Sequence, residues 1–207
     1  MKTVILANGI IRDYAATKQA AADAAHIIAC DGGLRHAHAM GMTPDAIIGD
    51  MDSVPPDLLE STKRSGTKTI IYPTMKDETD LELAMIHAHA LGATSIKILG
   101  ALGGRIDHAL ANMHLLAMYP QITEIWDEET SIQLIVSSLT LPKSDYVTLS
   151  LIPLTTEVTG ITTHGLIYPL RGETLKVGSS RGISNCFSED AAIVTIDTGL
   201  LLAIRVK

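Results

Sequence analysis

The clearest chemical signal in the sequence is a pair of aspartates that follows a short apolar run. Residues 46–50 read Ala-Ile-Ile-Gly-Asp, and Met51, Asp52 and Ser53 come next. If the extended backbone continues through Met51, the carboxylates of Asp50 and Asp52 lie on the same side of the chain. Such a pair at the carboxyl end of a strand suits Mg²⁺, which prefers oxygen ligands. The alternative is a solvated acidic turn, because Asp and Ser are common turn residues.

A second acidic group lies at residues 77–80, which read Asp-Glu-Thr-Asp after another apolar run. The spacing of Thr79 and Glu82 predicts a capping box at the start of a helix, where the charge of Asp80 is favourable. The alternative is that Asp77 and Asp80 join the first aspartate pair at one edge of a sheet. Converging carboxylates repel one another unless a divalent cation neutralises them, so this alternative also indicates a metal.

A glycine-rich turn at residues 100–108 reads Gly-Ala-Leu-Gly-Gly-Arg-Ile-Asp-His. Backbone N–H groups at a strand-to-helix turn bind phosphate well, and Arg105 adds forked donors for phosphate oxygens. Asp107 beside them is a candidate ligand of a metal or of a metal-bound water. The segment is neither a Walker A loop nor a GxGxxG fingerprint. The alternative is that the glycines serve tight packing alone.

The triplet Asp31-Gly32-Gly33 repeats the combination of a carboxylate and glycines at the end of another apolar run. Asp31 either caps the helix that follows or faces the same metal site as the other aspartates.

A polar segment near the end of the chain, residues 178–187, is rich in hydroxyl and amide groups. It is either a surface loop or the wall of a pocket for a small polar heterocycle, with Ser180, Ser184 and Asn185 as candidate contacts.

The secondary-structure elements that would position these residues follow two different sequence patterns along the chain. As far as about residue 128, short apolar runs alternate with helical stretches such as 81–91, in which Leu81, Ala84, Met85 and Ala88 form one apolar face. Uninterrupted apolar runs are typical of parallel strands covered on both faces. We therefore expect a doubly wound α/β domain. Its strands are predicted at residues 3–7, 27–31, 46–50, 67–72, 95–100 and 122–126.

After about Pro142 the helical pattern ends, and short strands separated by glycine and proline indicate a small antiparallel β-sandwich or barrel. The sequence therefore predicts two domains, a catalytic domain at 1–138 and a β domain at 139–207. The strands of the second domain are predicted at residues 146–151, 157–162, 173–177, 192–196 and 201–206.

Composition narrows the class of protein. The chain has 207 residues, 46% of them hydrophobic, and a net charge of −7 without a Lys/Arg block, which argues against binding nucleic acid. It has two cysteines far apart in the sequence, and we find neither a signal peptide nor an apolar run of membrane-spanning length. We expect a soluble, cytoplasmic protein.

The five motifs occur in one order along the chain, and together they resemble the thiamine pyrophosphokinase family. The resemblance covers nearly the whole sequence. It implies an α/β catalytic domain, a C-terminal β domain, and a homodimer whose active sites lie near the subunit interface. One departure is that the chain has Leu200-Leu201-Leu202 where eukaryotic relatives tend to place a tryptophan. Its single tryptophan is Trp126, and aromatic residues make up only 3% of the chain.

The resemblance also implies roles for particular residues. Asp50, Asp52, Asp77 and Asp80 would surround Mg²⁺, with Asp107 supporting the metal or its waters. Ser180, Ser184 and Asn185 would help to form the thiamine site. The nucleotide and cofactor would be held by Asp31, Gly32, Gly33, Gly103, Gly104, Arg105 and His108.

The implied reaction is transfer of the diphosphate of ATP to the thiamine hydroxyl, with AMP as the second product. Three alternatives remain from the sequence. They are a diphosphokinase for another alcohol such as a hydroxymethylpterin, a Mg²⁺-dependent nucleotide hydrolase, and a non-catalytic sensor of the vitamin or the nucleotide.

Overall fold

The computed structural model describes all residues from Met1 to Lys207 and divides them into two compact units. The first unit contains Met1–Leu115 and Ile125–Glu128, and the second contains Leu116–Glu124 and Glu129–Lys207. The functional division at residues 138 and 139 stays a prediction.

The first unit is built on a parallel sheet with the strand order β5-β1-β2-β3-β4, and β6, whose residues are divided between the two units, is the next strand beside β5. Each pair of neighbouring strands from β5 to β4 is parallel. Each predicted strand is present, with its ends displaced by no more than one residue, and the doubly wound class is confirmed. The strands are β1 (Lys2–Leu6), β2 (His26–Cys30), β3 (Ala46–Gly49), β4 (Lys68–Ile71), β5 (Ser95–Leu99) and β6 (Thr123–Trp126).

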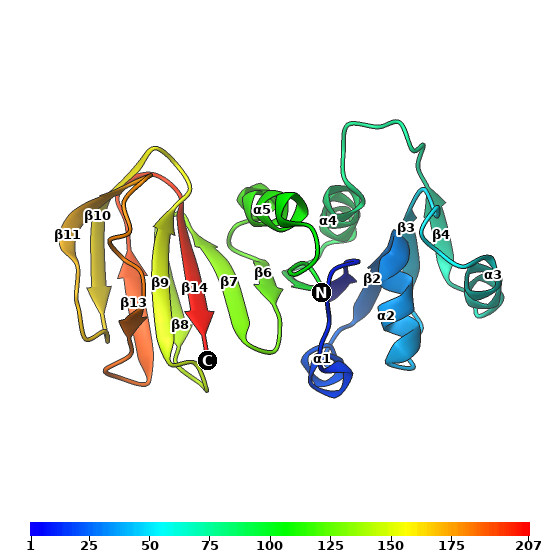
Figure 1. Cartoon of the computed structure of the whole chain (residues 1–207), viewed down its shortest axis with the longest axis horizontal. Coiled ribbons are helices and arrows are strands. Elements are labelled where there is room, and N and C mark those ends of the chain that lie inside the picture. Colours follow the sequence, from blue (N-terminus) through cyan, green and yellow to red (C-terminus); the bar gives the residue numbers. More distant parts are fainter. The chain divides into compact units, whose positions relative to one another are not determined.

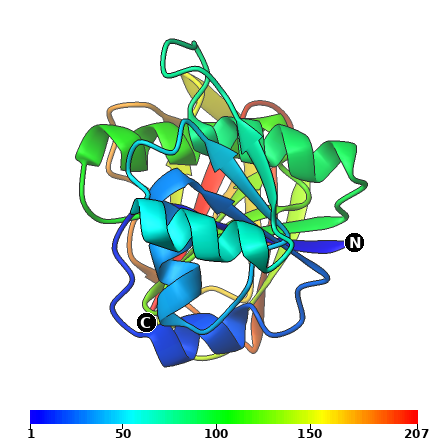
Figure 2. The same cartoon turned by 90° about the vertical axis from the view of Figure 1, so that its right-hand side faces the viewer.

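Helices cover both faces of this sheet, which explains why its strands are apolar throughout. Helices α4 and α5 lie on one face, and α1, α2 and α3 lie on the other (Figures 1 and 2). The bounds are α1 (Tyr14–Ala20), α2 (Leu34–Ala39), α3 (Pro56–Arg64), α4 (Asp80–Ala90) and α5 (Ile106–Leu115), with short 3₁₀ turns η1 (Asp31–Gly33) and η2 (Leu116–Met118).

The two helices that begin beside the predicted motifs differ in how well the sequence described them. Thr79 Oγ1 accepts a hydrogen bond from Glu82 N at 3.2 Å, so the predicted cap of α4 is present, and its predicted apolar face is buried. In α5 the helical spacing of the sequence predicts Leu110 on the apolar side with Ala109 and Met113, but Leu110 is 56% exposed. Asn112 is buried instead, because its amide donates to Ala101 O at 2.8 Å.

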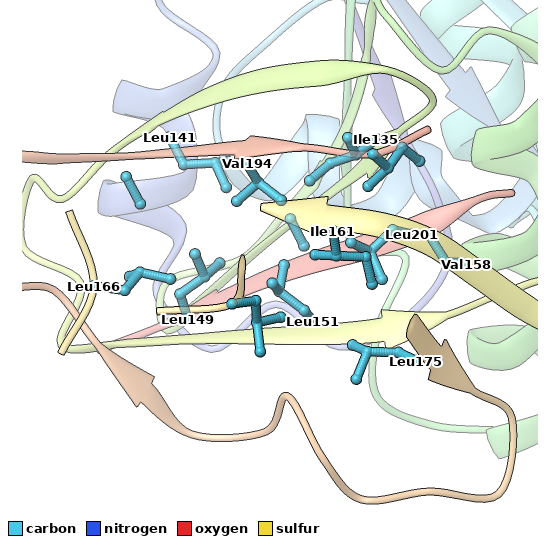
Figure 3. Packing of buried hydrophobic residues seen from close by; sticks show 14 of the residues in the cluster. Ile135, Leu141, Leu149, Leu151, Val158, Ile161, Leu166, Leu175, Val194 and Leu201 are labelled. Atoms are coloured by element: carbon cyan, nitrogen blue, oxygen red, sulfur yellow. The ribbon is translucent and has the colours of Figure 1, made fainter. Parts of the chain in front are cut away.

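The second unit consists of antiparallel strands in two groups, with the orders β12-β9-β14-β7 and β11-β10-β13-β8. Apolar side chains from both groups meet in one core, including Leu149 and Leu151 from the first and Val158 and Ile161 from the second (Figure 3). The predicted antiparallel class is confirmed. The strands are β7 (Thr130–Ile135), β8 (Ser138–Pro142), β9 (Thr148–Pro153), β10 (Glu157–His164), β11 (Arg171–Lys176), β12 (Asn185–Cys186), β13 (Ala191–Thr195) and β14 (Leu201–Val206). The sequence did not predict β7, β8 or the two-residue strand β12.

A buried arginine ties the end of the second unit to its other strands. Arg205 Nη2 donates to Glu124 Oε1 at 3.2 Å, Ser131 Oγ at 2.6 Å and Gln133 Oε1 at 3.2 Å. Its guanidinium carbon also lies 4.7 Å from the centre of the Tyr146 ring. The cation and its partners therefore compensate one another inside the unit.

None of the helices has the length and the apolar character needed to cross a membrane.

Candidate active site

A cavity of about 540 Å³ opens at the carboxyl edge of the parallel sheet. It is lined by residues that follow β1, β2, β3 and β5 and by the first residues of α4 and α5. The chain leaves β1 for β2 on one side, while β5 pairs with β1 on the other. In open α/β sheets ligands bind at such a switch point, outside the carboxyl ends of the strands.

Three aspartates form an acidic cluster in this cavity. Oxygen atoms of Asp31, Asp50 and Asp52 all lie within 4.8 Å of one another. Asp31 is 7% exposed, and its buried Oδ1 accepts no hydrogen bond. Its side chain caps neither η1 nor α2. Of the two roles predicted for Asp31, the geometry therefore agrees with membership of the cluster.

The route by which Asp50 and Asp52 come together differs from the expected one. The strand ends at Gly49, and Met51 has a left-handed backbone with φ of 68°. The extended geometry does not continue, so the alternation argument for this pair was wrong. Instead, Asp52 N donates to Asp50 Oδ1 at 3.2 Å within a tight turn. This hydrogen bond holds the pKa of Asp50 below its usual value.

Asp80 lies beside the acidic cluster, at the start of α4. A Cβ added to Gly49 would lie 2.9 Å from Asp31 Cβ and 3.3 Å from Asp80 Oδ2, so these two side chains approach the same small space. Burial raises the pKa of Asp80, and the ammonium of Lys76, 3.0 Å from its Oδ1, acts in the opposite direction. Asp77 is exposed and belongs to neither the cluster nor the cavity lining, so the structure does not bring it to the proposed metal site.

The glycine-rich turn forms another wall of the cavity. Gly103 and Gly104 have φ of 76° and 70° and line it together with Arg105 and His108. The guanidinium of Arg105 forms a two-point pair with Asp107, at 3.1 Å from Nε and 2.5 Å from Nη2. Hydrogen bonding to Arg105 lowers the pKa of Asp107 to about 2. Asp107 itself does not line the cavity.

Gly32 and Gly33 are buried and do not line the cavity. A Cβ on Gly33 would lie 2.1 Å from Leu6 O, and one on Gly32 would lie 2.4 Å from the Asn8 side chain. These glycines allow the end of β1 to pack closely. They therefore position Asn8, which does line the cavity.

Sequence reasoning missed the loop that follows β1. Asn8, Gly9 and Ile10 line the cavity, and Asn8 Oδ1 accepts a hydrogen bond from Arg35 Nη2 at 3.2 Å. The available signal was a polar residue and a glycine directly after the predicted strand 3–7, the same pattern that we used at three other strands. Ser53 and Asn112 also line the cavity.

A second cavity, of about 640 Å³, lies within the second unit. Ser184 and Asn185 line it, and Ser180 does not. Tyr168, whose side chain is 69% exposed, lies on its wall with Ile183. The lining is therefore partly apolar and includes one aromatic ring.

The amide of Asn185 is used within the protein itself. Its Oδ1 accepts from Tyr168 N at 3.1 Å and from Cys186 N at 2.9 Å, and its Nδ2 donates to Tyr168 O at 2.7 Å. Asn185 is 8% exposed. It holds both backbone polar groups of Tyr168 and leaves one amide hydrogen for a ligand.

Comparisons with known proteins agree with this arrangement. Residues 17–126 match the thiamin pyrophosphokinase catalytic domain, and residues 137–201 match the thiamin pyrophosphokinase vitamin B1 binding domain. Thiamine pyrophosphokinase 1 of Arabidopsis thaliana is 34% identical over 181 residues, covering 79% of this chain and 66% of the relative. The chain thus spans slightly less than two thirds of that plant protein. Thiamine pyrophosphokinase of Bacillus subtilis (strain 168) is 28% identical over 176 residues, covering 80% and 79%.

Solved structures give the same result. The crystal structure of thiamine pyrophosphokinase from Bacillus subtilis has a TM-score of 0.89 at 25% identity and covers 100% of this chain and 99% of its own. That of thiamin pyrophosphokinase from Geobacillus thermodenitrificans has a TM-score of 0.87 at 27% identity, covering 100% and 98%. The resemblance inferred from the motifs is confirmed: this chain belongs to the thiamine pyrophosphokinase family.

Proposed function

We propose that the chain is a thiamine diphosphokinase, which transfers the diphosphate of ATP to the hydroxyl of thiamine and releases AMP. The observation that carries the proposal is the acidic cluster beside the glycine-rich turn, in a chain of this family. The thiamine oxygen forms a bond to the β-phosphorus, and the bond from that phosphorus to the α,β-bridging oxygen breaks. AMP keeps the bridging oxygen, and the hydroxyl proton passes to solvent.

The acidic cluster fits Mg²⁺. Its donors are carboxylate oxygens that lie close enough to share one ion, and the buried, unpartnered Oδ1 of Asp31 lacks a compensating group within the protein. We assign Asp31, Asp50 and Asp52 as the ligands, with Asp80 adjacent. Bound there, the ion would supply positive charge to the phosphate oxygens.

The residues of the glycine-rich turn would orient the phosphates. Gly103 and Gly104 present backbone N–H groups at a helix start, where an anion is favoured. Arg105 lines the same cavity, and its Nη1 is not used in the pair with Asp107. Diphosphoryl transfer depends mainly on positioning and charge neutralisation, so His108 does not have to act as a base.

We place the acceptor in the second cavity. The Tyr168 ring offers a flat surface to the rings of thiamine, and Ser184 offers a hydroxyl. Asn185 contributes by holding Tyr168. We propose that the reaction takes place in the cytoplasm. The two free cysteines support this location, because a reducing compartment keeps thiols from forming disulfides.

The assay that tests this function combines ATP, Mg²⁺ and thiamine, and measures AMP and thiamine diphosphate. We expect equal amounts of the two products, and none in EDTA or without thiamine. ATP consumption without an alcohol would favour a nucleotide hydrolase instead. AMP formed with a hydroxymethylpterin and not with thiamine would mean that the acceptor is wrong and the nucleotide site right.

We further propose a homodimer with active sites near the subunit interface. Mixing Asp52→Asn with Tyr168→Ala tests this, because each variant lacks one part of the site. If the two parts of one active site come from different subunits, a mixed dimer contains one intact site with both the kcat and the KM for thiamine of the wild type, a combination that neither variant has alone. No recovery after subunit exchange, in a mixture shown to contain mixed dimers, would contradict the proposal.

A further inference from the structure

One lysine, Lys76, forms an ion pair with a carboxylate that lines the first cavity. The Nζ of Lys76 is 3.0 Å from Asp80 Oδ1, and its side chain is only 13% exposed. The same ammonium donates to Pro73 O at 3.3 Å, which fixes it at the end of the segment that enters α4. A lysine that gives up most of its contact with water requires a compensating charge, and Asp80 provides it.

The surroundings of Lys76 carry an excess of negative charge. Asp31, Asp50, Asp52 and Asp80 line one cavity. Arg105 also lines it, but its guanidinium is 74% exposed and paired with Asp107. The positive charge of Lys76 also stabilises the ionised form of Asp50. Lys76 therefore neutralises part of the negative charge that a divalent cation bound at the acidic cluster would otherwise neutralise.

We propose that Lys76 is a positioning residue that couples metal binding to nucleotide binding. In the free protein its ammonium holds Asp80 and opposes a divalent cation at the neighbouring acidic cluster. When ATP phosphates enter the cavity, their negative charge offsets that ammonium, and the metal binds more tightly. The enzyme would thus take up its metal with the nucleotide rather than before it. The inference rests on the proposed function for the metal site at the acidic cluster and for the identity of the nucleotide.

The test is direct titration of Mn²⁺ by electron paramagnetic resonance, which needs no turnover. Removing a positive charge close to the acidic cluster removes its electrostatic repulsion of a divalent cation. We therefore expect Lys76→Gln, without nucleotide, to bind Mn²⁺ roughly tenfold more tightly than the wild type. With α,β-methylene ATP, the gain in Mn²⁺ affinity caused by the nucleotide should be smaller in Lys76→Gln than in the wild type.

Two matched variants separate the charge from other effects. Lys76→Arg keeps the positive charge and should bind Mn²⁺ within about threefold of the wild type, since a change of that size is below 1 kcal/mol. Lys63→Gln removes an exposed lysine that pairs with Glu60 at 3.4 Å in α3, and it should leave Mn²⁺ affinity unchanged. Circular dichroism of each variant establishes that the fold is intact.

Equal or weaker Mn²⁺ binding by folded Lys76→Gln, without nucleotide, would overturn the proposal. So would an unchanged effect of the nucleotide analogue. If Lys76→Gln does not fold, Lys76→Met, which keeps the apolar stem, is titrated instead under the same criteria. Failure of the proposed function would appear differently, as Mn²⁺ binding of the expected pattern in a protein that forms no thiamine diphosphate.

Discussion

The two cavities differ in how many hydrogen bonds their buried polar side chains make to the protein itself. In the first cavity, Asp31 is buried and its Oδ1 accepts no hydrogen bond. Oxygen atoms of Asp50 and Asp52 lie within 4.8 Å of an oxygen of Asp31, close enough for the three carboxylates to share one metal ion. In the second, the amide of Asn185 already makes three hydrogen bonds to its own chain. A polar motif in a sequence therefore indicates a ligand in one case and support for a neighbouring side chain in the other. The difference lies in how many hydrogen bonds the fold has already supplied.

The largest effect is expected at the buried ion pair of the second unit, between Arg205 and Glu124. Arg205→Met removes a buried cation and leaves Glu124 without its charged partner. We expect the free energy of unfolding to fall by roughly 3–5 kcal/mol, as for other broken buried ion pairs. Urea denaturation measures it. The exposed pair of Lys176 and Glu157 is the control, because Lys176→Met should cost less than about 1 kcal/mol. Similar losses for both would mean that Arg205 is not a structural anchor.

In the first unit, the loss of a charge should affect turnover and not folding. Asp52→Asn removes a proposed ligand that is exposed in the cavity. We expect kcat for thiamine diphosphate formation to fall roughly 10²–10³-fold, by analogy with removal of an electrostatic donor. Asp57→Asn, an exposed change in the first turn of α3, serves as the control for activity. Turnover of Asp52→Asn near the wild-type rate would refute the ligand assignment.

Asn185→Ala tests whether the amide supports Tyr168. The substitution leaves the Tyr168 N–H and carbonyl without their partners, so we expect a loss of roughly 1–3 kcal/mol in stability. Ser180→Ala, at an exposed position outside the cavity, should stay within about 0.5 kcal/mol of the wild type. If Asn185→Ala instead keeps full stability and loses only affinity for thiamine, the amide is a substrate contact.

Tyr168→Ala tests the aromatic wall itself. Ring contacts contribute about 0.5–1.5 kcal/mol beyond burial, so we expect KM for thiamine to rise roughly 2- to 10-fold. Tyr168→Phe keeps the ring and should restore most of this loss. An equal rise in KM for both variants would assign the effect to the hydroxyl group.

The smallest effect is a pH dependence in the metal-free protein. The pKa of Asp80 is raised by burial, so between its unfolded and folded values the folded state binds the additional proton. At neutral pH the folded protein bears the full free-energy cost of burying the ionised carboxylate of Asp80. This cost is relieved as the pH falls through the folded pKa. We therefore expect the wild type to gain stability relative to Asp80→Asn on acidification in EDTA, measured by calorimetry. A constant difference in Tm would show that burial does not strain Asp80.

The sequence predicted the fold better than the details of the sites. Apolar strands such as β3 and β5 were found because covering a parallel sheet on both faces requires them. The motifs at Asp31, Asp50 and Gly103 were found because ligands bind at the carboxyl ends of such strands. The left-handed Met51 and the exposed Leu110 were not predictable from a repeating pattern, because turns and neighbouring hydrogen bonds decide them. The engagement of Asn185 by Tyr168, 17 residues away in the chain, depends on the tertiary fold.

We propose that Asp31, whose buried Oδ1 has no hydrogen-bond partner, belongs to a metal site, whereas the engaged amide of Asn185 does not contact the reacting groups. Titration of Mn²⁺ in the presence of α,β-methylene ATP, followed by electron paramagnetic resonance, compares the wild type with Asp31→Asn and Asn185→Ala. Loss of an outer partner of a metal ligand already costs roughly 10–100-fold in affinity, so loss of a ligand should cost at least as much in Asp31→Asn. Asn185→Ala should bind Mn²⁺ like the wild type. Full Mn²⁺ affinity in folded Asp31→Asn would show that Asp31 is not a metal ligand.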